Sequence, residues 1–258
     1  QADGTVVEIN ELTTLVKSQL VVDSESQADL PYNSTLSKLE VLEAYTITPK
    51  GEKIPVAANA IRTVEDDNSS GAAMFSDQKH KIIIFPKVTP GSKTYYKTRL
   101  TTYKPLLPGY FYTRLTFSPN VEVQSYEYSL NYPEELKLYS DIKDVKQTKD
   151  EIIDGVRHIS FTYQNLKMRK KEQLQVSSSD FSPHIYISTF DSQQEFAKAY
   201  ENRIAEKFLV TSEIQKMADE ITKSVDKRVA VDKTLNLKKE QARALYNWVS
   251  RNIRYVAI

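Results

Sequence analysis

Residues 39–66 read LEVLEAYTITPKGEKIPVAANAIRTVED, and this stretch decides the fold class. The run 39–48 predicts a strand with one face formed by Val41, Glu43, Tyr45 and Ile47. Pro49, Lys50 and Gly51 then indicate a turn, because glycine readily supplies the positive φ that a tight hairpin needs. We therefore expect residues 54–64 to return beside the first run as the second strand of a β-hairpin.

Similar runs continue from Thr5 to about Phe190. Residues 81–88, KIIIFPKV, predict a strand that is covered on both faces and ends at Pro86. Asp154-Gly155 predicts a second hairpin. Further strands are expected at 5–18 (with Val7, Ile9 and Leu15 on one face), 93–104, 110–117, 121–133 and 184–190. Many short strands between regular turns indicate an antiparallel sandwich or barrel rather than a parallel α/β sheet.

The hydrophobic period changes at Asp191, and residues 191–258 predict three amphipathic helices. Asp191 or Ser192 is expected to cap the first helix, and Ser212 with Gln215 to form a capping box on the second. The apolar stripes comprise Phe196, Tyr200, Ile204 and Phe208; Ile214, Met217, Ala218, Ile221 and Val225; and Ala242, Leu245, Tyr246, Val249 and Ile253. The expected domains are thus a β lobe, 1–190, and a smaller, incomplete helical piece, 191–258.

The amino-acid composition excludes several classes of function. The chain has 258 residues, 40% of them hydrophobic, and a formal net charge of +1, so it has no general basic field for nucleic acid. No apolar run is long enough to span a membrane. Because the chain contains no cysteine, it offers neither a thiol nucleophile nor a disulfide.

Candidate sites in the sequence are weak. His80, His158 and His184 stand alone at or near strands, without the spacing of a metal site. The acidic stretch 65–71 lacks the alternating carboxylates of a calcium loop, and we interpret it as a solvated loop. The cluster Lys167, Arg169, Lys170 and Lys171 is interpreted as an exposed hairpin tip rather than a phosphate site. Asn33 and Asn68 begin formal glycosylation sequons.

An aromatic-rich stretch, 95–117, leaves two interpretations open. Its rings could form a platform on which sugars stack, or they could be ordinary cross-strand packing. The residues concerned are Tyr95, Tyr96, Tyr103, Tyr110, Phe111 and Tyr112. Serine-hydrolase and glycine-rich phosphate-loop motifs are missing. The residues themselves therefore predict no catalytic, cofactor-binding or metal-binding side chain.

The ending ARALYNWVSRNIRYVAI, 242–258, resembles the first conserved stretch of bacterial transglutaminase-like domains. The matching positions are Ala242, Leu245, Tyr246, Trp248, Val249, Asn252, Ile253, Arg254 and Tyr255. Upstream, LEVLEAYTITPKGEKIPV, FSDQKHKIIIFPKVTPGSKTYYKT and PLLPGYFY look like the β-sandwich domain of unknown function that precedes such domains in many bacterial envelope proteins.

The resemblance implies an immunoglobulin-like sandwich followed by the first helices of a papain-like cysteine fold. It also implies a periplasmic or cell-envelope location. In that family a cysteine, a histidine and an aspartate act on acyl groups. The nucleophile would lie beyond Ile258, so no catalytic residue is carried over. Trp248 and Tyr255 match positions assigned to packing.

Three functions follow as hypotheses. The first is a non-catalytic accessory domain that binds a protein or an envelope component. The second is an inactive fragment of a Cys–His–Asp acyl-transferase or protease. The third is a carbohydrate-binding or cell-wall-binding sandwich that uses its tyrosines.

Overall fold

The computed structural model describes residues 3–65, 77–170, 176–177, 180–232 and 234–253. It divides into two compact units, Gln1–Ala199 and Tyr200–Ile258, and each is described here by itself. The predicted class is confirmed: the chain is mainly β, with antiparallel sheets followed by a smaller helical piece. The expected domain assignment, 1–190 and 191–258, stays a prediction.

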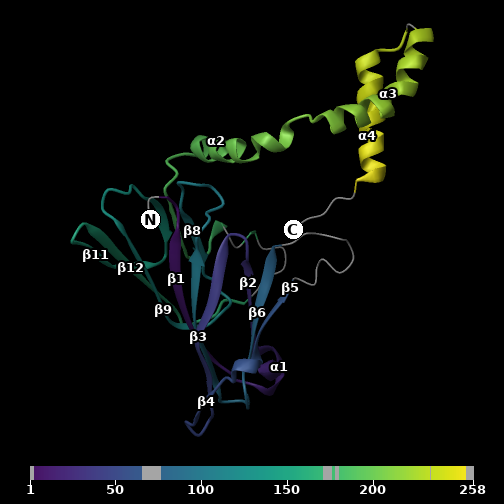
Figure 1. Ribbon diagram of the computed structural model, residues 1–258. Coiled ribbons are helices and arrows are strands. Elements are labelled where there is room, and N and C mark those ends of the chain that lie inside the picture. Colours follow the sequence, from purple (N-terminus) through teal and green to yellow (C-terminus); the bar gives the residue numbers. More distant parts are fainter. Residues whose placement is uncertain (1–2, 66–76, 171–175, 178–179, 233, 254–258) are drawn as a thin grey trace. The chain divides into compact units, whose positions relative to one another are not determined.

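The described strands of the first unit form four antiparallel sheets (Figure 1). One contains, in order, β1 (Val6–Leu15), β7 (Lys93–Thr102), β3 (Ser37–Ile47) and β4 (Lys53–Pro55). A second contains β2 (Gln27–Asn33), β6 (Gln78–Ile84) and β5 (Ile61–Glu65). A third contains β10 (Tyr139–Lys143), β13 (His184–Ser188) and β8 (Tyr112–Thr116). The fourth contains β11 (Lys146–Ile153), β12 (Val156–Asn165) and β9 (Val123–Pro133), and a short helix, α1 (Val22–Glu25), precedes β2.

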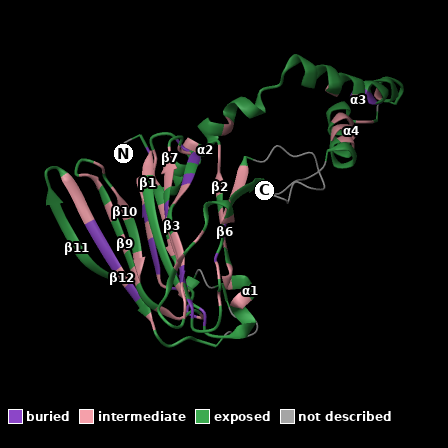
Figure 2. Ribbon diagram, turned by 60° about the horizontal axis from the view of Figure 1, so that its bottom comes forward, coloured by how far each residue is buried: buried purple, intermediate pink, exposed green. Residues whose placement is uncertain are grey.

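The main hydrophobic core lies between the third and fourth sheets. Its buried members come from β12, β13 and the residue that follows β8: Phe117, Ile159, Phe161, Tyr163, Ile185 and Ile187. Figure 2 shows the buried stretch along β12 beside the exposed β11. Burying one isoleucine side chain stabilises the fold by about 1.5–3 kcal/mol. Because side chains alternate along a strand, Ile185 and Ile187 in the core turn His184, Tyr186 and Ser188 to the opposite face of β13.

The first predicted hairpin is shorter than expected. Gly51 does take a positive φ, +85°, in the turn. However, only Lys53–Pro55 pairs with β3, and Ile61–Glu65 pairs with β6 in another sheet. The prediction that residues 54–64 return beside β3 is therefore wrong beyond Pro55, where the chain leaves the sheet through a short 3-10 turn at Ala58–Ala60.

The prediction that Val41 shares one face of β3 with Glu43 and Tyr45 is wrong, because the strand contains a β-bulge. Val41 pairs with Thr98, whereas Glu43 pairs with the next residue, Lys97, so the register shifts at Leu42. Side chains alternate between the two faces of a strand, so one extra residue places the side chains before the bulge on the opposite face from the one predicted. Val41 therefore lies on the same face as buried Thr98, opposite to Glu43 and Tyr45.

The isoleucines of β6 are covered on one face only. Ile83 is fully buried, whereas the side chain of Ile84 is 38% exposed, so the prediction of two covered faces is wrong. The strand ends at Ile84, just before Phe85 and Pro86, as expected. The second predicted hairpin is confirmed: Asp154 and Gly155 both take a positive φ, 50° and 74°, as a two-residue turn of type I′ requires.

Helix α2 (Gln193–Ile204) begins where the sequence predicted. The Oγ of Ser192 accepts a hydrogen bond from the Glu195 amide (3.1 Å), and the Glu195 carboxylate accepts one from the Asp191 amide (2.8 Å). The serine thus satisfies one amide in the first turn of the helix, and the glutamate satisfies the amide of Asp191 just before the cap. The chain then passes into a 3-10 turn at Ala205–Phe208, so the predicted helical face does not continue regularly to Phe208.

The capping box predicted at Ser212 and Gln215 is wrong. Helix α3 (Ser212–Val231) is capped by Thr211, whose Oγ1 accepts a hydrogen bond from the Ile214 amide (3.3 Å). Ser212 is the first helical residue. The side-chain Nε2 of Gln215 donates a hydrogen bond to Asp219 Oδ1 (2.8 Å) and does not reach back to the start of the helix. The sequence offers two adjacent hydroxyl residues here, and a pattern one residue out of register is enough to misplace the cap.

Helix α4 (Leu237–Asn252) packs against α3 in the second unit (Figure 1). The contact buries Thr222 and Val225, and an Arg228–Glu240 ion pair (2.6 Å) joins the helices. Several side chains of the predicted stripes stay exposed: Ile214, Met217, Tyr246 and Val249. Trp248 is half-buried, while residues 254–258, including Tyr255, lie outside the described residues. None of the described helices combines the length and apolarity that a membrane crossing demands.

Candidate functional site

A hollow of about 480 Å³ lies over the β10-β13-β8 sheet, and we call it the tyrosine hollow. It is lined by Tyr112, Thr113, Arg114, Tyr139, Ser140, Asp141, Tyr186, Ile187 and Ser188. Each strand contributes three successive residues, and those of β13 pair directly with those of β10 and β8. The lining is therefore a continuous part of the sheet. The face opposite the core contributes two rows of side chains.

The first row has a small residue between two aromatic ones. Ser188 of β13 pairs with Tyr139 on one side and with Tyr112 on the other. Neighbouring strands lie about 4.8 Å apart, so the Cα atoms of the two tyrosines are about 10 Å from each other. The short serine side chain leaves the space between them unfilled. This gap explains why the sheet is hollowed here.

The second row places opposite charges on either side of Tyr186. Asp141 pairs with it from β10, and Arg114 pairs with it from β8. The Arg114 guanidinium lies over the Tyr186 ring, 4.8 Å from the centroid. The Tyr186 hydroxyl lies 3.1 Å from Thr116 Oγ1. Hydrogen bonds from Thr116 and then Arg114 lower the pKa of Tyr186, because they favour the phenolate.

His184 supports this row from the side. Its ring stacks on Tyr186 with the centroids 4.1 Å apart and the planes at 15°. Its Nδ1 donates to the Ser182 carbonyl oxygen (3.0 Å), and its Nε2 lies 3.3 Å from Asp141 Oδ2. The latter separation is an ion-pair distance without hydrogen-bond geometry. The His184 side chain is 8% exposed and that of Asp141 is 75% exposed, so a fixed ring supports a solvated carboxylate.

Ser182, His184 and Asp141 have the residue types of a hydrolytic triad but not its arrangement. In a triad the imidazole accepts the proton of the serine hydroxyl. Here His184 bonds to the carbonyl of Ser182, and the buried Ser182 Oγ has no hydrogen-bond partner among the described residues. The serine is therefore not activated by this histidine.

The three histidines singled out in the sequence do not meet. His80 lies on β6 beside Asp29 (2.6 Å), His158 lies on β12 beside Asn131 (2.7 Å), and His184 lies on β13. These strands belong to three different sheets. Within the ranges that the structure describes, no group of three potential ligands could hold a metal ion.

The aromatic residues of 95–117 are dispersed rather than gathered on one platform. Tyr95 stacks on Tyr45 (4.4 Å), Tyr110 stacks on Phe190 (4.1 Å), and Phe111 packs against the core. The Tyr103 hydroxyl donates to the Ser34 carbonyl (2.7 Å), and Tyr96 pairs with Leu12. Of the six predicted residues, Tyr112 alone lines the tyrosine hollow.

The remaining candidates show ordinary structural roles where they are described. The Arg169 amide donates to the Pro119 carbonyl (2.8 Å), which ties the basic cluster to a neighbouring turn; Lys171 lies outside the described residues. Asn33 accepts bonds from the Thr35 and Leu36 amides within a turn (3.0 and 3.1 Å). Glu65 pairs with Lys79 (3.1 Å), while 66–71 and Asn68 are not described.

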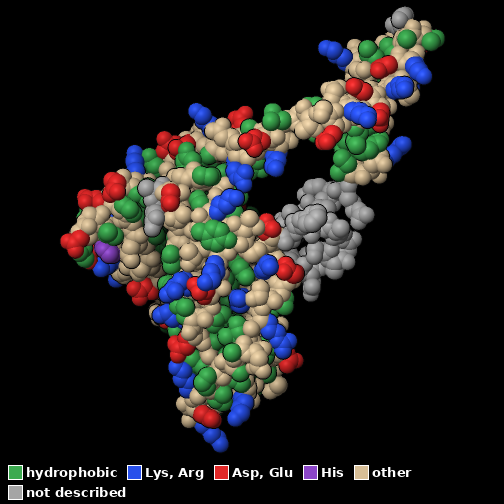
Figure 3. All heavy atoms as spheres, viewed as in Figure 1, with side chains coloured by type: hydrophobic (Ala, Val, Ile, Leu, Met, Phe, Trp, Pro, Cys, Tyr) green, Lys and Arg blue, Asp and Glu red, His purple; other side chains and the backbone are tan. Residues whose placement is uncertain are grey.

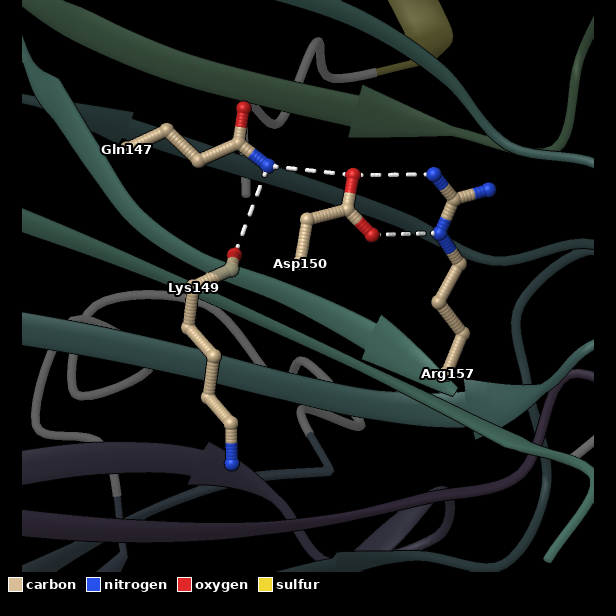
Figure 4. A network of polar contacts seen from close by, with 4 residues as sticks. All are labelled: Gln147, Lys149, Asp150 and Arg157. Carbon is tan, nitrogen blue, oxygen red and sulfur yellow. Dashed lines mark hydrogen bonds and ion pairs between the residues drawn. The ribbon is translucent and has the colours of Figure 1, made fainter. Parts of the chain in front are cut away.

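A second polar cluster lies on the β11–β12 hairpin (Figure 4). Arg157 donates two hydrogen bonds to Asp150, Nε to Oδ1 (2.7 Å) and Nη2 to Oδ2 (2.8 Å). Gln147 Nε2 contacts both the Lys149 carbonyl (3.4 Å) and Asp150 (3.5 Å) beside a bulge. Charges and a bulge on an edge strand hinder pairing with other chains. We assign this cluster to edge protection.

Charges of both signs are interspersed over the face that Figure 3 shows, with no extended area of one sign. This agrees with the balanced composition, 35 Lys+Arg against 34 Asp+Glu. Large single-sign fields are the usual electrostatic footprint of nucleic-acid binding.

His184 and Tyr112 could be singled out from the sequence, whereas Arg114, Asp141, Tyr139 and Tyr186 were missed. The available signal was alternation: YTRLT and HIYIS place aromatic and polar side chains at every second position. That pattern indicates a polar strand face. It does not indicate which strands pair.

The family model DUF3857, described as a "Domain of Unknown Function with solved-structure structure", matches residues 2–170. This chain belongs to the DUF3857 family. The match ends before β13, so the tyrosine hollow combines strands from inside the matched region with one beyond it. The comparison with curated proteins found no match.

Among solved structures, the chain is similar to a Parabacteroides distasonis ATCC 8503 protein described as a "putative protease", whose crystal structure was determined at 2.00 Å. The TM-score is 0.81 and the sequence identity is 19%. The similarity covers 100% of this DUF3857 chain and 49% of the other chain. The likeness concerns the fold, and this chain spans about half the length of that protein.

Proposed function

We propose that this chain is the non-catalytic, ligand-binding part of a bacterial cell-envelope protein of the transglutaminase-like kind, and that the tyrosine hollow is its binding surface. The observation that supports this most is the hollow itself. Three tyrosines, an arginine and an aspartate converge on one sheet face, and a buried histidine fixes their centre. Concave sites with aromatic walls and a few convergent polar groups are the usual form of ligand sites.

The chemistry of the site supports binding over catalysis. The chain has no cysteine, and the buried serine next to His184 is not activated by it. The Asp141 side chain is 75% exposed, so its oxygens are accessible as hydrogen-bond acceptors for a ligand. The envelope location and the transglutaminase-like assignment come from the resemblance of 242–258.

A second candidate is that the chain belongs to an active Cys–His–Asp acyl-transferase or protease whose triad lies beyond Ile258. The similarity to a longer protein described as a "putative protease" favours it. Reading the coding sequence past Ile258 tests this candidate. A cysteine, then a histidine, then an aspartate would support it, whereas their absence in that order would remove it.

Cosedimentation with a purified bacterial envelope fraction tests the binding role. We expect the chain to sediment with the envelope, and the variants Tyr112→Ala and Arg114→Ala to remain in solution. Matched controls are Tyr103→Ala, since Tyr103 and Tyr112 are 52% and 57% exposed, and Arg99→Ala, another exposed strand arginine. If all four variants sediment like the unchanged chain, the tyrosine hollow is not the binding surface.

A further inference from the structure

We propose that the ligand of the tyrosine hollow is an oligosaccharide carrying a carboxylate, bound with its acidic group toward Arg114 and its hydroxyl or amide N–H groups toward Asp141. This inference rests on the proposed binding function and specifies its chemistry. It follows from three features of the hollow: its shape, the kind of polar groups it offers, and the distribution of charge.

The shape suits a pyranose ring. The Cα atoms of Tyr112 and Tyr139 lie about 10 Å apart with Ser188 between them. Half of the roughly 3.5 Å thickness of each aromatic ring faces this gap, which leaves a width of about 6.5 Å. The remaining width accepts one saturated ring with a tyrosine on each side. Sugar rings present C–H faces to aromatic walls, and Tyr and Trp side chains supply such contact area at low entropic cost.

The polar groups at the centre of the hollow come from side chains. On a sheet face the central strand has its backbone N–H and C=O groups paired on both sides, as β13 has with β10 and β8. A peptide that binds by adding a strand needs free backbone groups at an edge. The hollow instead offers carboxylate, guanidinium, hydroxyl and ring groups. This is the complement that a polyhydroxylated ligand requires.

The charges favour an anionic substituent on the β8 side. In the part of the chain that is described, no carboxylate forms an ion pair with Arg114, whose guanidinium lies on the Tyr186 ring. Stacking orients the planar guanidinium while leaving N–H groups on its edge to meet a carboxylate in two places. On the β10 side Asp141 is an acceptor, and Lys137 lies over the Tyr139 ring (4.9 Å).

The site is held ready before a ligand arrives. Tyr186 is fixed by the His184 stack on one side and by Thr116 at its hydroxyl. Fixing a side chain in its bound conformation reduces the ordering cost of association, which is about 0.5–1.5 kcal/mol per mobile side chain. Tyr186 and Arg114 are therefore expected to contribute to affinity without rearrangement.

Isothermal titration calorimetry on the chain tests the inference with two disaccharides that differ by one group. One is N-acetylglucosaminyl-N-acetylmuramic acid, which carries a lactyl carboxylate; the other is chitobiose, which lacks it. We expect the acidic sugar to bind about tenfold more tightly. Arg114→Ala should remove that preference, and Tyr186→Ala should weaken both sugars. Arg99→Ala is the control, and circular dichroism checks that every variant is folded.

Each outcome has a distinct meaning. Equal affinity for both sugars, or a preference that survives Arg114→Ala, overturns the acidic specificity. No heat with either sugar at millimolar concentration overturns the carbohydrate inference. If the chain then still sediments with the envelope and Arg114→Ala still releases it, the proposed binding function stands with another ligand. If neither assay shows binding, both proposals fail.

Discussion

The Nε2 of buried His184 lies 3.3 Å from Oδ2 of exposed Asp141, across the paired strands β13 and β10. The same imidazole stacks on Tyr186 and donates to the Ser182 carbonyl. One side chain thus connects the floor of the tyrosine hollow to its acidic wall. This role distinguishes His184 from the other two histidines.

Replacing His184 should cost far more stability than replacing His158. His184→Ala removes a buried ring and its stacking contact, and we expect the free energy of unfolding to fall by about 2 kcal/mol. His158→Ala removes a half-buried ring bonded to Asn131, and it should cost less, about 0.5 kcal/mol. Urea unfolding at neutral pH measures both. Equal losses would show that His184 does not support the hollow.

Local signals in the sequence predicted the parts of the fold that depend on neighbours in the chain. The turn at Asp154-Gly155 requires two adjacent residues with positive φ, and both are visible in the sequence. The bulge at Leu42 depends on how β3 meets β7, so the predicted face failed before it. Likewise, residues 61–65 resemble a hairpin strand, but their pairing with β6 is a tertiary choice.

The candidate site was largely beyond sequence reasoning for the same reason. His184 was visible as a lone histidine, but its role depends on Asp141, which it meets only through the pairing of β10 with β13. Arg114 joins the same row by pairing with Tyr186 from β8. Each of the three strands has an ordinary alternating pattern. The sequence of a single strand does not show that the polar faces of all three lie side by side in one sheet.

The Asp150–Arg157 pair should make stability depend on acidity. Hydrogen bonds from Arg157 hold the pKa of Asp150 below its ordinary 3.8. A carboxyl with a lowered folded pKa stabilises the protein above its unfolded pKa, and this contribution is lost as the pH falls through the folded pKa. Both side chains are about two-fifths exposed, so we expect at most about 1 kcal/mol.

Unfolding of the chain and of Arg157→Ala at neutral pH and at about pH 2.5 checks this prediction. The variant should be less stable at neutral pH, and the difference should shrink or vanish in acid. Asp150→Asn should give the same pattern, and combining the two substitutions should add little. A difference that is the same at both pH values would show that the ion pair is not responsible.

Glycines at two positive-φ positions should respond differently to alanine. At Gly155 (φ +74°) an added Cβ meets nothing within 4 Å, so Gly155→Ala should cost about 1 kcal/mol from backbone strain alone. At Gly4 (φ +85°) the Cβ would lie 2.6 Å from the Tyr110 carbonyl oxygen. Gly4→Ala should therefore cost more. Thermal unfolding compares them, and a larger loss at Gly155 would contradict the packing at Gly4.

The start of α3 can be tested with adjacent residues. Thr211→Ala removes the hydroxyl that accepts from the Ile214 amide, and it should destabilise the helix by about 1 kcal/mol. Ser212→Ala, at the first helical position, should be nearly neutral. Hydrogen exchange of the first-turn amides of α3 reports the effect directly. Faster exchange in Ser212→Ala but not in Thr211→Ala would restore the cap predicted from the sequence.

Hydroxyl-radical footprinting of the chain bound to isolated bacterial envelopes tests the central claim most directly, because tyrosines are reactive probes present in and outside the tyrosine hollow. We predict that oxidation of Tyr112, Tyr139 and Tyr186 falls on binding, while that of Tyr103 and Tyr246, both exposed elsewhere, does not change. Protection of Tyr103 or Tyr246 with unchanged oxidation at Tyr112, Tyr139 and Tyr186 would contradict the assignment of the tyrosine hollow as the binding surface.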